Sequence, residues 1–328
     1  MNNILKKKAT ALCAATVFSL ALLTACGNSR VAEQEDLKAK GIASMQAGDY
    51  SAAAASFKEA LSKSRYSVGD EEIDLTFYLA TADYLAGDKA DAIASLDALT
   101  DLETDNANAC FLRGSMYLLE GENEKAISDY DAAIAADPTD YDCYIAIYEN
   151  LAARGQTDKA NEYLNKALGA GKDSAKDFLN RGRIYELQGQ RAAAESAYKS
   201  AADKGEGIAA LYSALLTAED GNTEDAVNDV SAYMKEKKKL TPGENLLIAQ
   251  IYGADGQYDA AASAVQAGLN DAGASEDEKQ DLLRETIVLY EKQLDFNAAY
   301  AAANDYIAAY PGDAAVAREL TFLSTRKK

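Results

Sequence analysis

The chain has 328 residues, with 33 lysine and arginine residues against 53 aspartate and glutamate residues, and a net charge of −20 at pH 7. This balance argues against direct binding to nucleic acid or to anionic lipid headgroups, because both would be repelled. The chain has no histidine, which removes Ser-His and Cys-His catalytic pairs and the commonest metal ligand. We therefore expect no catalytic residue, no metal and no cofactor, although the many carboxylates leave a paired-carboxylate enzyme open.

The first element in chain order is an N-terminal signal. Residues 1–8 carry three lysines and no acid, and residues 9–23 form a short apolar run. Such a run is too short for an ordinary membrane-spanning helix, which needs about 20 residues. A basic start, a short apolar run and small residues before a break are typical of a secretory signal.

The four residues that close this run, Leu23 to Cys26, resemble the lipobox of bacterial lipoproteins. The resemblance implies a signal peptide over residues 1–25, lipidation of Cys26 and a short tether over residues 26–33. The mature chain would have 30 basic and 53 acidic residues, a net charge of −23. Acyl chains would anchor it to the cell membrane on the extracytoplasmic side, or to the outer membrane of a diderm cell. An ordinary signal with an incidental cysteine is the alternative.

The rest of the chain repeats one pattern with a period near 34 residues. Each copy has a glycine in a short polar turn and an alanine five residues later, and in the eighth copy Leu294 takes the place of the glycine. This period, with helix-forming segments on both sides of the turn, predicts stacked helical hairpins. The glycines are Gly48, Gly87, Gly121, Gly155, Gly189, Gly221 and Gly256, and the alanines are Ala53, Ala92, Ala126, Ala160, Ala194, Ala226, Ala261 and Ala299.

Residues 107–140 show the pattern most completely. Gly121 is expected to end the first helix, because glycine readily takes the left-handed conformation. Gly114 and Ala126 lack bulk where two helices must approach closely, and Pro138 cannot continue a helix. This pattern closely resembles the tetratricopeptide repeat. The resemblance implies an all-α fold, a right-handed α-solenoid of about eight hairpins over residues 34–312.

The chain is expected to end with a capping helix and tail over residues 313–328. Residues 314–324 have Val316, Leu320 and Leu323 on one helical face. A repeat array needs such a cap to cover its last apolar surface.

The resemblance also implies that first helices line a concave face that binds peptides. Side chains not used in the core motif would point there. Phe77, Tyr84 and Phe111 are expected to form an apolar groove for an extended or helical segment; packing between neighbouring repeats is the alternative. A charged second half is expected further along, with solvated surface as its alternative. The full set of predicted partner-binding residues is Phe77, Tyr84, Phe111, Asn108, Leu118, Asp142, Glu149, Lys176, Arg183 and Glu186.

One family activity is not carried over. Chaperone-binding members hold a C-terminal carboxylate with a set of Lys, Asn and Arg residues. Lys38 matches one place of that set, but Ile42 and Tyr78 stand where asparagines would be.

Two smaller features lie within the repeats. The run Lys235–Lys239 is the one basic cluster, expected at a solvated helix end where lysines complement the helix dipole. Cys110 and Cys143 lie on apolar stretches and are expected as small core residues, with a disulfide between them left open.

These observations predict a membrane-anchored, extracytoplasmic scaffold or adaptor that binds other proteins or peptides and is not an enzyme. Alternatives are a small-ligand-binding lipoprotein, an envelope enzyme with paired carboxylates, and self-assembly through the outer faces. The sequence does not identify the partner, the envelope type or the oligomeric state.

Overall fold

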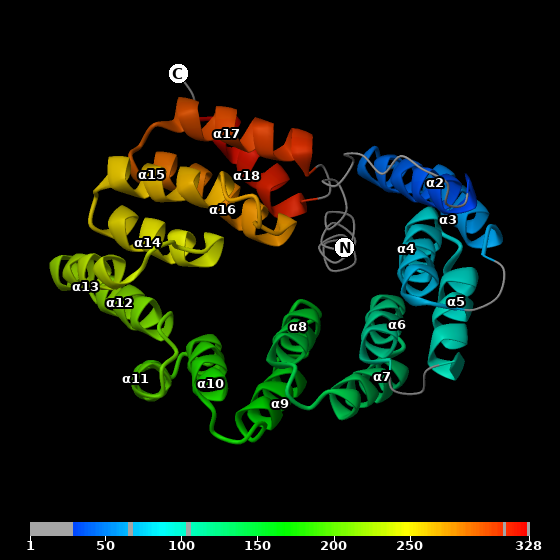
Figure 1. Ribbon diagram of the computed structural model, residues 1–328, viewed down its shortest axis with the longest axis horizontal. Helices are drawn as coiled ribbons and strands as arrows, with labels where there is room; N and C mark the ends of the chain where they lie inside the picture. Colours follow the sequence, from blue (N-terminus) through cyan, green and yellow to red (C-terminus); the bar gives the residue numbers. More distant parts are fainter. Residues whose placement is uncertain (1–28, 65–67, 103–105, 311–312, 327–328) are drawn as a thin grey trace. The chain divides into compact units, whose positions relative to one another are not determined.

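The structure, a computed structural model, describes residues 29–64, 68–102, 106–310 and 313–326. Over these residues it has seventeen α-helices and no strand (Figure 1), which confirms the all-α class. The predicted signal peptide and Cys26 lie outside the described residues. Among the helices described, none is both long enough and apolar enough to cross a membrane.

The chain divides into two compact units, residues 1–160 with 310–313, and residues 161–309 with 314–328. Helix α9 (Thr157–Leu168) runs across the boundary between them. The first unit holds α2 (Ser29–Gln46), α3 (Tyr50–Ser62), α4 (Asp70–Ala86), α5 (Lys89–Leu102), α6 (Ala107–Glu120), α7 (Asn123–Ala136) and α8 (Tyr141–Ala152). The second holds α10 (Ala175–Leu187), α11 (Arg191–Asp203), α12 (Ala209–Glu219), α13 (Thr223–Glu236), α14 (Pro242–Ala254), α15 (Tyr258–Leu269), α16 (Glu276–Lys292), α17 (Phe296–Ala309) and α18 (Ala314–Ser324).

Within each unit the helices pair into hairpins that stack. In the first unit α6 packs against α7 of its own hairpin and also against α8 of the next. In the second unit α12 packs against α14, and α14 packs against α16. First helices of successive hairpins therefore lie against one another, which is the arrangement of a repeat array.

Small residues occupy the positions where helices meet most closely. All eight of the repeated alanines are fully buried. A Cβ atom on Gly114 would lie 3.0 Å from the Cβ of Asp129 and 3.0 Å from a ring carbon of Tyr130, on the facing helix. Larger side chains at these places would push the two helices of a hairpin apart.

The turn positions explain the recurring glycine. All seven repeated glycines have a positive φ, between 68° and 105°. Leu294, which takes the glycine place in the eighth copy, has the same left-handed backbone at φ 60°, and its side chain is 74% exposed. A residue with a Cβ is strained in this conformation by about 1–2 kcal/mol.

Replacing Leu294 with glycine is expected to stabilise the second unit by about 1 kcal/mol, because the strain is relieved and little packing is lost. The measurement is the midpoint of urea unfolding followed by circular dichroism. Leu294→Ala is the matched control, since alanine shortens the side chain but stays strained. Equal gains from both substitutions would show that the exposed leucine side chain, and not the backbone, is the cause.

The C-terminal end of the array agrees with the sequence prediction, and the N-terminal end begins earlier than predicted. Helix α18 is present where it was predicted, with Val316 and Leu323 buried and Leu320 partly exposed. Helix α2 begins at Ser29, so residues 29–33 are helical although they were expected in the tether. Polar residues can start a helix without an apolar periodicity, and the pattern therefore placed its beginning too late.

The two cysteines of the repeats, Cys110 and Cys143, are both buried and unbonded. Burial raises the pKa of the Cys110 thiol. Both residues therefore act as small core side chains in this structure.

Candidate functional site

A groove of about 300 Å³ lies between α4 and α6, the first helices of the second and third repeats. Spacings of three and four residues place the lining side chains of each helix in one stripe. Those from α4 are Asp70, Ile73, Asp74, Phe77 and Thr81, and those from α6 are Asn108, Phe111 and Leu112.

Two aromatic rings contribute apolar surface to this groove. Phe77 is 8% exposed and Phe111 is 2% exposed. The Phe111 ring also packs on Tyr130, with 5.7 Å between the ring centroids. Phe111 therefore packs within its own hairpin, whereas Phe77 belongs to an apolar cluster with Ala109 and Leu112 of the next repeat. Both rings present only a small part of their surface to the groove.

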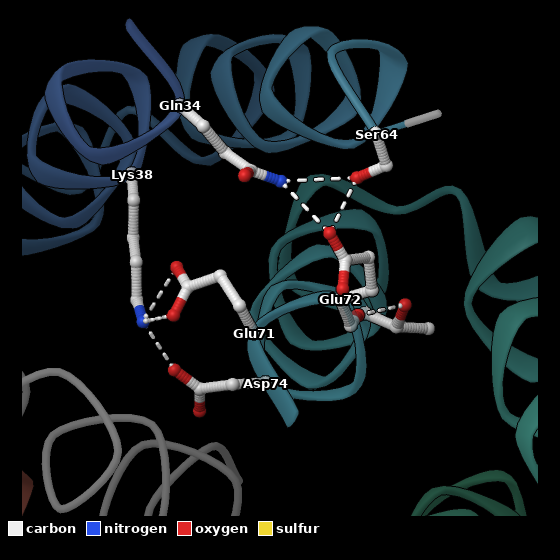
Figure 2. Close-up of polar contacts among 7 residues, drawn as sticks. Gln34, Lys38, Ser64, Glu71, Glu72 and Asp74 are labelled. Carbon is white, nitrogen blue, oxygen red and sulfur yellow. Dashed lines mark hydrogen bonds and ion pairs between the residues drawn. The ribbon is translucent and has the colours of Figure 1, made fainter. Parts of the chain in front are cut away.

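Carboxylates near the start of α4 face Lys38 of α2 (Figure 2). The Nζ atom of Lys38, on α2, lies 2.5 Å from Asp74 and 3.1 Å from Glu71. Burial opposes the charge on Lys38, but the bonds to Asp74 and Glu71 outweigh it and raise the pKa of this lysine. Asp74 thus belongs both to the groove lining and to an ion-pair cluster.

A second polar cluster fixes the start of α4. Glu72 accepts a hydrogen bond of 2.6 Å from the Ser64 hydroxyl and one of 2.9 Å from the backbone N–H of Gly69. The side chain of Gln34 donates to both Ser64 and Glu72 (Figure 2). The Ser64 hydroxyl is the main cause that lowers the pKa of Glu72. These contacts cap α4 and hold its first turn, which carries Asp70, against α2.

The ion pairs of Lys38 bear on the carboxylate-binding activity of chaperone-binding relatives. This lysine is buried and already neutralised by Glu71 and Asp74. It is not available for a partner's C-terminal carboxylate, which agrees with the absence of asparagine at residues 42 and 78.

The groove brings together three of the predicted partner-binding residues, Phe77, Asn108 and Phe111. Asn108 is exposed at its rim. Tyr84 lies outside the groove lining, where its hydroxyl donates to Glu120 at 2.6 Å. Leu118 is also outside and is only 2% exposed, so it offers almost no surface to a partner.

The five charged members of the predicted set lie on two helices. Asp142 and Glu149 are exposed on α8, in the first unit, and Lys176 is exposed on α10, in the second. Arg183 donates to Asn180 at 3.1 Å, and Glu186 accepts a hydrogen bond from the Tyr198 hydroxyl. Their joint role in binding a partner stays a prediction.

Glu186 gives the second unit a distinctive pH dependence. Burial raises the pKa of Glu186, although its bond from Tyr198 acts in the opposite direction. Its carboxyl therefore holds a proton more tightly in the folded chain than in the unfolded chain. The contribution of Glu186 to the free energy of unfolding should therefore rise as the pH falls through the raised pKa.

Glu186→Gln is therefore expected to stabilise the second unit at pH 7, because glutamine can still accept the Tyr198 bond and carries no charge to bury. Urea unfolding of both chains at pH 7 and at about pH 4.5, near the usual pKa of glutamate, measures the effect. The advantage of the variant should shrink at the lower pH. A difference that does not change with pH would contradict the assignment.

The basic run of the sequence is partly neutralised. Helix α13 ends at Glu236, and the lysines that follow lie at its C-terminal end, as expected. Lys237 is 2.9 Å from the buried Glu244, and Lys239 is 2.7 Å from Asp271. Two of these lysines therefore compensate local carboxylates.

Five of the eight groove residues are not in the predicted partner-binding set, namely Asp70, Ile73, Asp74, Thr81 and Leu112. Asp70 and Ile73 lie one turn before Asp74 and Phe77 on the same stripe of α4. The spacing from Gly48 to Gly87 is longer than the period near 34, so the repeat pattern did not fix where α4 begins, although the run of acids at residues 70–72 is a helix-start signal. Leu112 is buried and also belongs to the apolar core cluster around Phe77.

Residues 77–141, which include α5 and α6 and most of the groove, match the family model described as tetratricopeptide repeat. The chain contains tetratricopeptide repeats. It is 29% identical over 212 residues to tetratricopeptide repeat protein 37 of Xenopus laevis, a match that covers 60% of this chain but only 13% of that protein.

Two solved structures are similar to this tetratricopeptide repeat chain. One is a tetratricopeptide repeat protein from Parabacteroides merdae ATCC 43184, with 20% identity and a TM-score of 0.42 over 77% of this chain and 99% of that one. The other is PilW, a type IV pilus biogenesis factor, with 18% identity and a TM-score of 0.39 over 65% of this chain and 98% of that one.

Tetratricopeptide repeats support a role as a protein-interaction scaffold, because stacked hairpins present an extended surface to partners. Proteins built from them are generally scaffolds and not enzymes. In the part of the chain that the structure describes, no three Cys, Asp or Glu side chains gather as metal ligands.

Proposed function

We propose that this protein is a lipid-anchored, extracytoplasmic scaffold that binds partner proteins at the α4–α6 groove. The observation that carries the proposal is a preformed groove with aromatic rings inside and polar side chains at its rim. Such a surface can bind a segment with little rearrangement of the backbone. The scaffold acts by binding and not by catalysis, in keeping with a chain that has no histidine.

The anchor rests on the sequence around Cys26, which resembles a lipobox. A lipid anchor would hold bound partners near the membrane and raise their local concentration. Cys26→Ser is expected to abolish incorporation of labelled palmitate and to release the protein from the membrane fraction. Labelling that survives the substitution would rule out this anchor.

In-cell crosslinking with mass spectrometry tests the groove. Alanine at Phe77 or Phe111 would damage the core as well, because both rings are buried. Asn108→Tyr is the better variant, since it obstructs the groove from an exposed rim position. Partner capture is expected to fall at least tenfold.

Ala132→Tyr is the matched control, because it adds the same ring at an exposed position of α7, in the same hairpin. The control should capture partners as the native chain does. Equal capture by both variants would place the binding surface elsewhere. A bound small molecule that Asn108→Tyr displaces would favour a small-ligand receptor.

A further inference from the structure

We propose that the α4–α6 groove selects partner segments in which a large apolar side chain stands beside a lysine or arginine. This inference rests on the proposed role of the groove as the docking surface, and it adds the chemistry of the partner. It is carried by apolar walls and carboxylates that the structure places in one groove.

The preference for a large apolar side chain follows from the size of the groove and from the residues that line it. Ile73, Phe77, Phe111 and Leu112 line the groove, whose volume is about 300 Å³. This volume is at the low end of the range for ligand pockets, about 300–1,000 Å³. The groove therefore suits one or two side chains of a segment, and a large apolar side chain would bury the most surface there.

The preference for a lysine or arginine follows from the carboxylates at the same groove. Asp70 and Asp74 line the groove directly, and Glu71 lies beside them on α4. Lys38 offsets one of these three negative charges through its ion pairs. The side chains of Glu71 and Asp74 remain 43% and 36% exposed, so both still reach solvent, although Oε1 of Glu71 is buried beside Lys38.

The surroundings add to this negative potential. The chain as a whole has a net charge of −20, and a cleft with apolar walls focuses the field of the charges that line it. Asn108, at the opposite rim, is uncharged and can accept or donate a hydrogen bond to a peptide backbone. A segment with an acidic residue at this point would be repelled, and one with a basic residue would be held.

The test selects peptides without assuming a partner. A phage-displayed library of random dodecapeptides is panned on the full chain, solubilised in mild detergent, and on its Asp70→Asn/Asp74→Asn variant. In this variant Lys38 keeps its pair with Glu71, and circular dichroism checks the fold. The matched control is Asp91→Asn/Glu124→Gln, which removes two first-turn acids from α5 and α7.

The native chain and the control should enrich peptides that carry lysine or arginine beside a large apolar residue. The groove variant should lose the basic preference, keep the apolar one, and bind the native-selected peptides about tenfold more weakly, with less dependence on salt. An apolar preference alone, or the same basic preference on the groove variant, would overturn the charge inference and leave the docking surface standing. Enrichment that Asn108→Tyr does not change would overturn the docking surface as well.

Discussion

Gly182→Ala is expected to destabilise the second unit by about 2 kcal/mol, because the added methyl group has no space. Gly182 is buried on α10, and a Cβ atom there would lie 2.5 Å from Cδ1 of Tyr198 and closer still to Cε1. The Tyr198 ring is fully buried, stacks on Tyr212 at 5.1 Å and is held by Glu186. It cannot turn away without losing those contacts.

The midpoint of urea unfolding, followed by circular dichroism, measures this cost. Gly243→Ala on α14 is the control, because its nearest neighbour would be 3.9 Å away. Alanine favours a helix over glycine by about 1 kcal/mol, so the control should be neutral or stabilising. In a Tyr198→Leu background the cost of Gly182→Ala should fall. A higher midpoint for Gly182→Ala alone would show that the two helices are not in close contact.

Arg113→Ala is expected to cost about 3 kcal/mol in the first unit, because it leaves a buried carboxylate without its partner. Arg113, on α6, binds Asp129 of α7 through two nitrogens, at 2.7 and 2.8 Å. It also reaches Asp97 of α5 at 2.7 Å. One guanidinium group therefore connects three helices, and Asp129 is buried beside it.

Lys125→Ala on α7 provides the comparison. Its pair with Glu122 is 2.5 Å long but exposed, and solvent screening leaves such pairs with little effect on stability. The double variant Arg113→Ala/Asp129→Ala should be less destabilised than Arg113→Ala, because no buried charge is left unpaired; Asp97 is exposed to solvent. Urea unfolding of the three variants decides the matter. Equal costs for Arg113→Ala and Lys125→Ala would mean that Asp129 is well solvated after all.

The fold could be predicted from the sequence because its constraints act locally. A left-handed turn favours glycine and a close helix crossing favours a small residue, so both leave a regular mark in the sequence. Leu294 shows that the turn conformation is the same in the eighth repeat, since the backbone there is left-handed even without glycine. The beginning of α4, the first helix of the second repeat, was harder to predict, because the chain from Gly48 to Gly87 is longer than one repeat period.

The site was only partly predictable. Phe77, Asn108 and Phe111, which helical spacing put on the predicted concave face, all line the groove, and their role in binding stays a prediction. Helical spacing could not tell that Leu118 is covered or that Tyr84 lies elsewhere, because periodicity gives the face of a helix and not what packs along its length. The ion pair between Lys38 and Asp74 joins different hairpins, so no local sequence pattern predicts it.

The stacking of hairpins within each unit has a mechanical consequence. Contacts such as those of α6 with α7 and α8, or of α14 with α15 and α16, join helices that are neighbours in the chain. A pulling force on the ends of such a stack is carried by one interface after another, and each yields separately. Under tension each unit should lengthen in hairpin-sized steps and recoil when released, as a spring does, and not snap open at a single load.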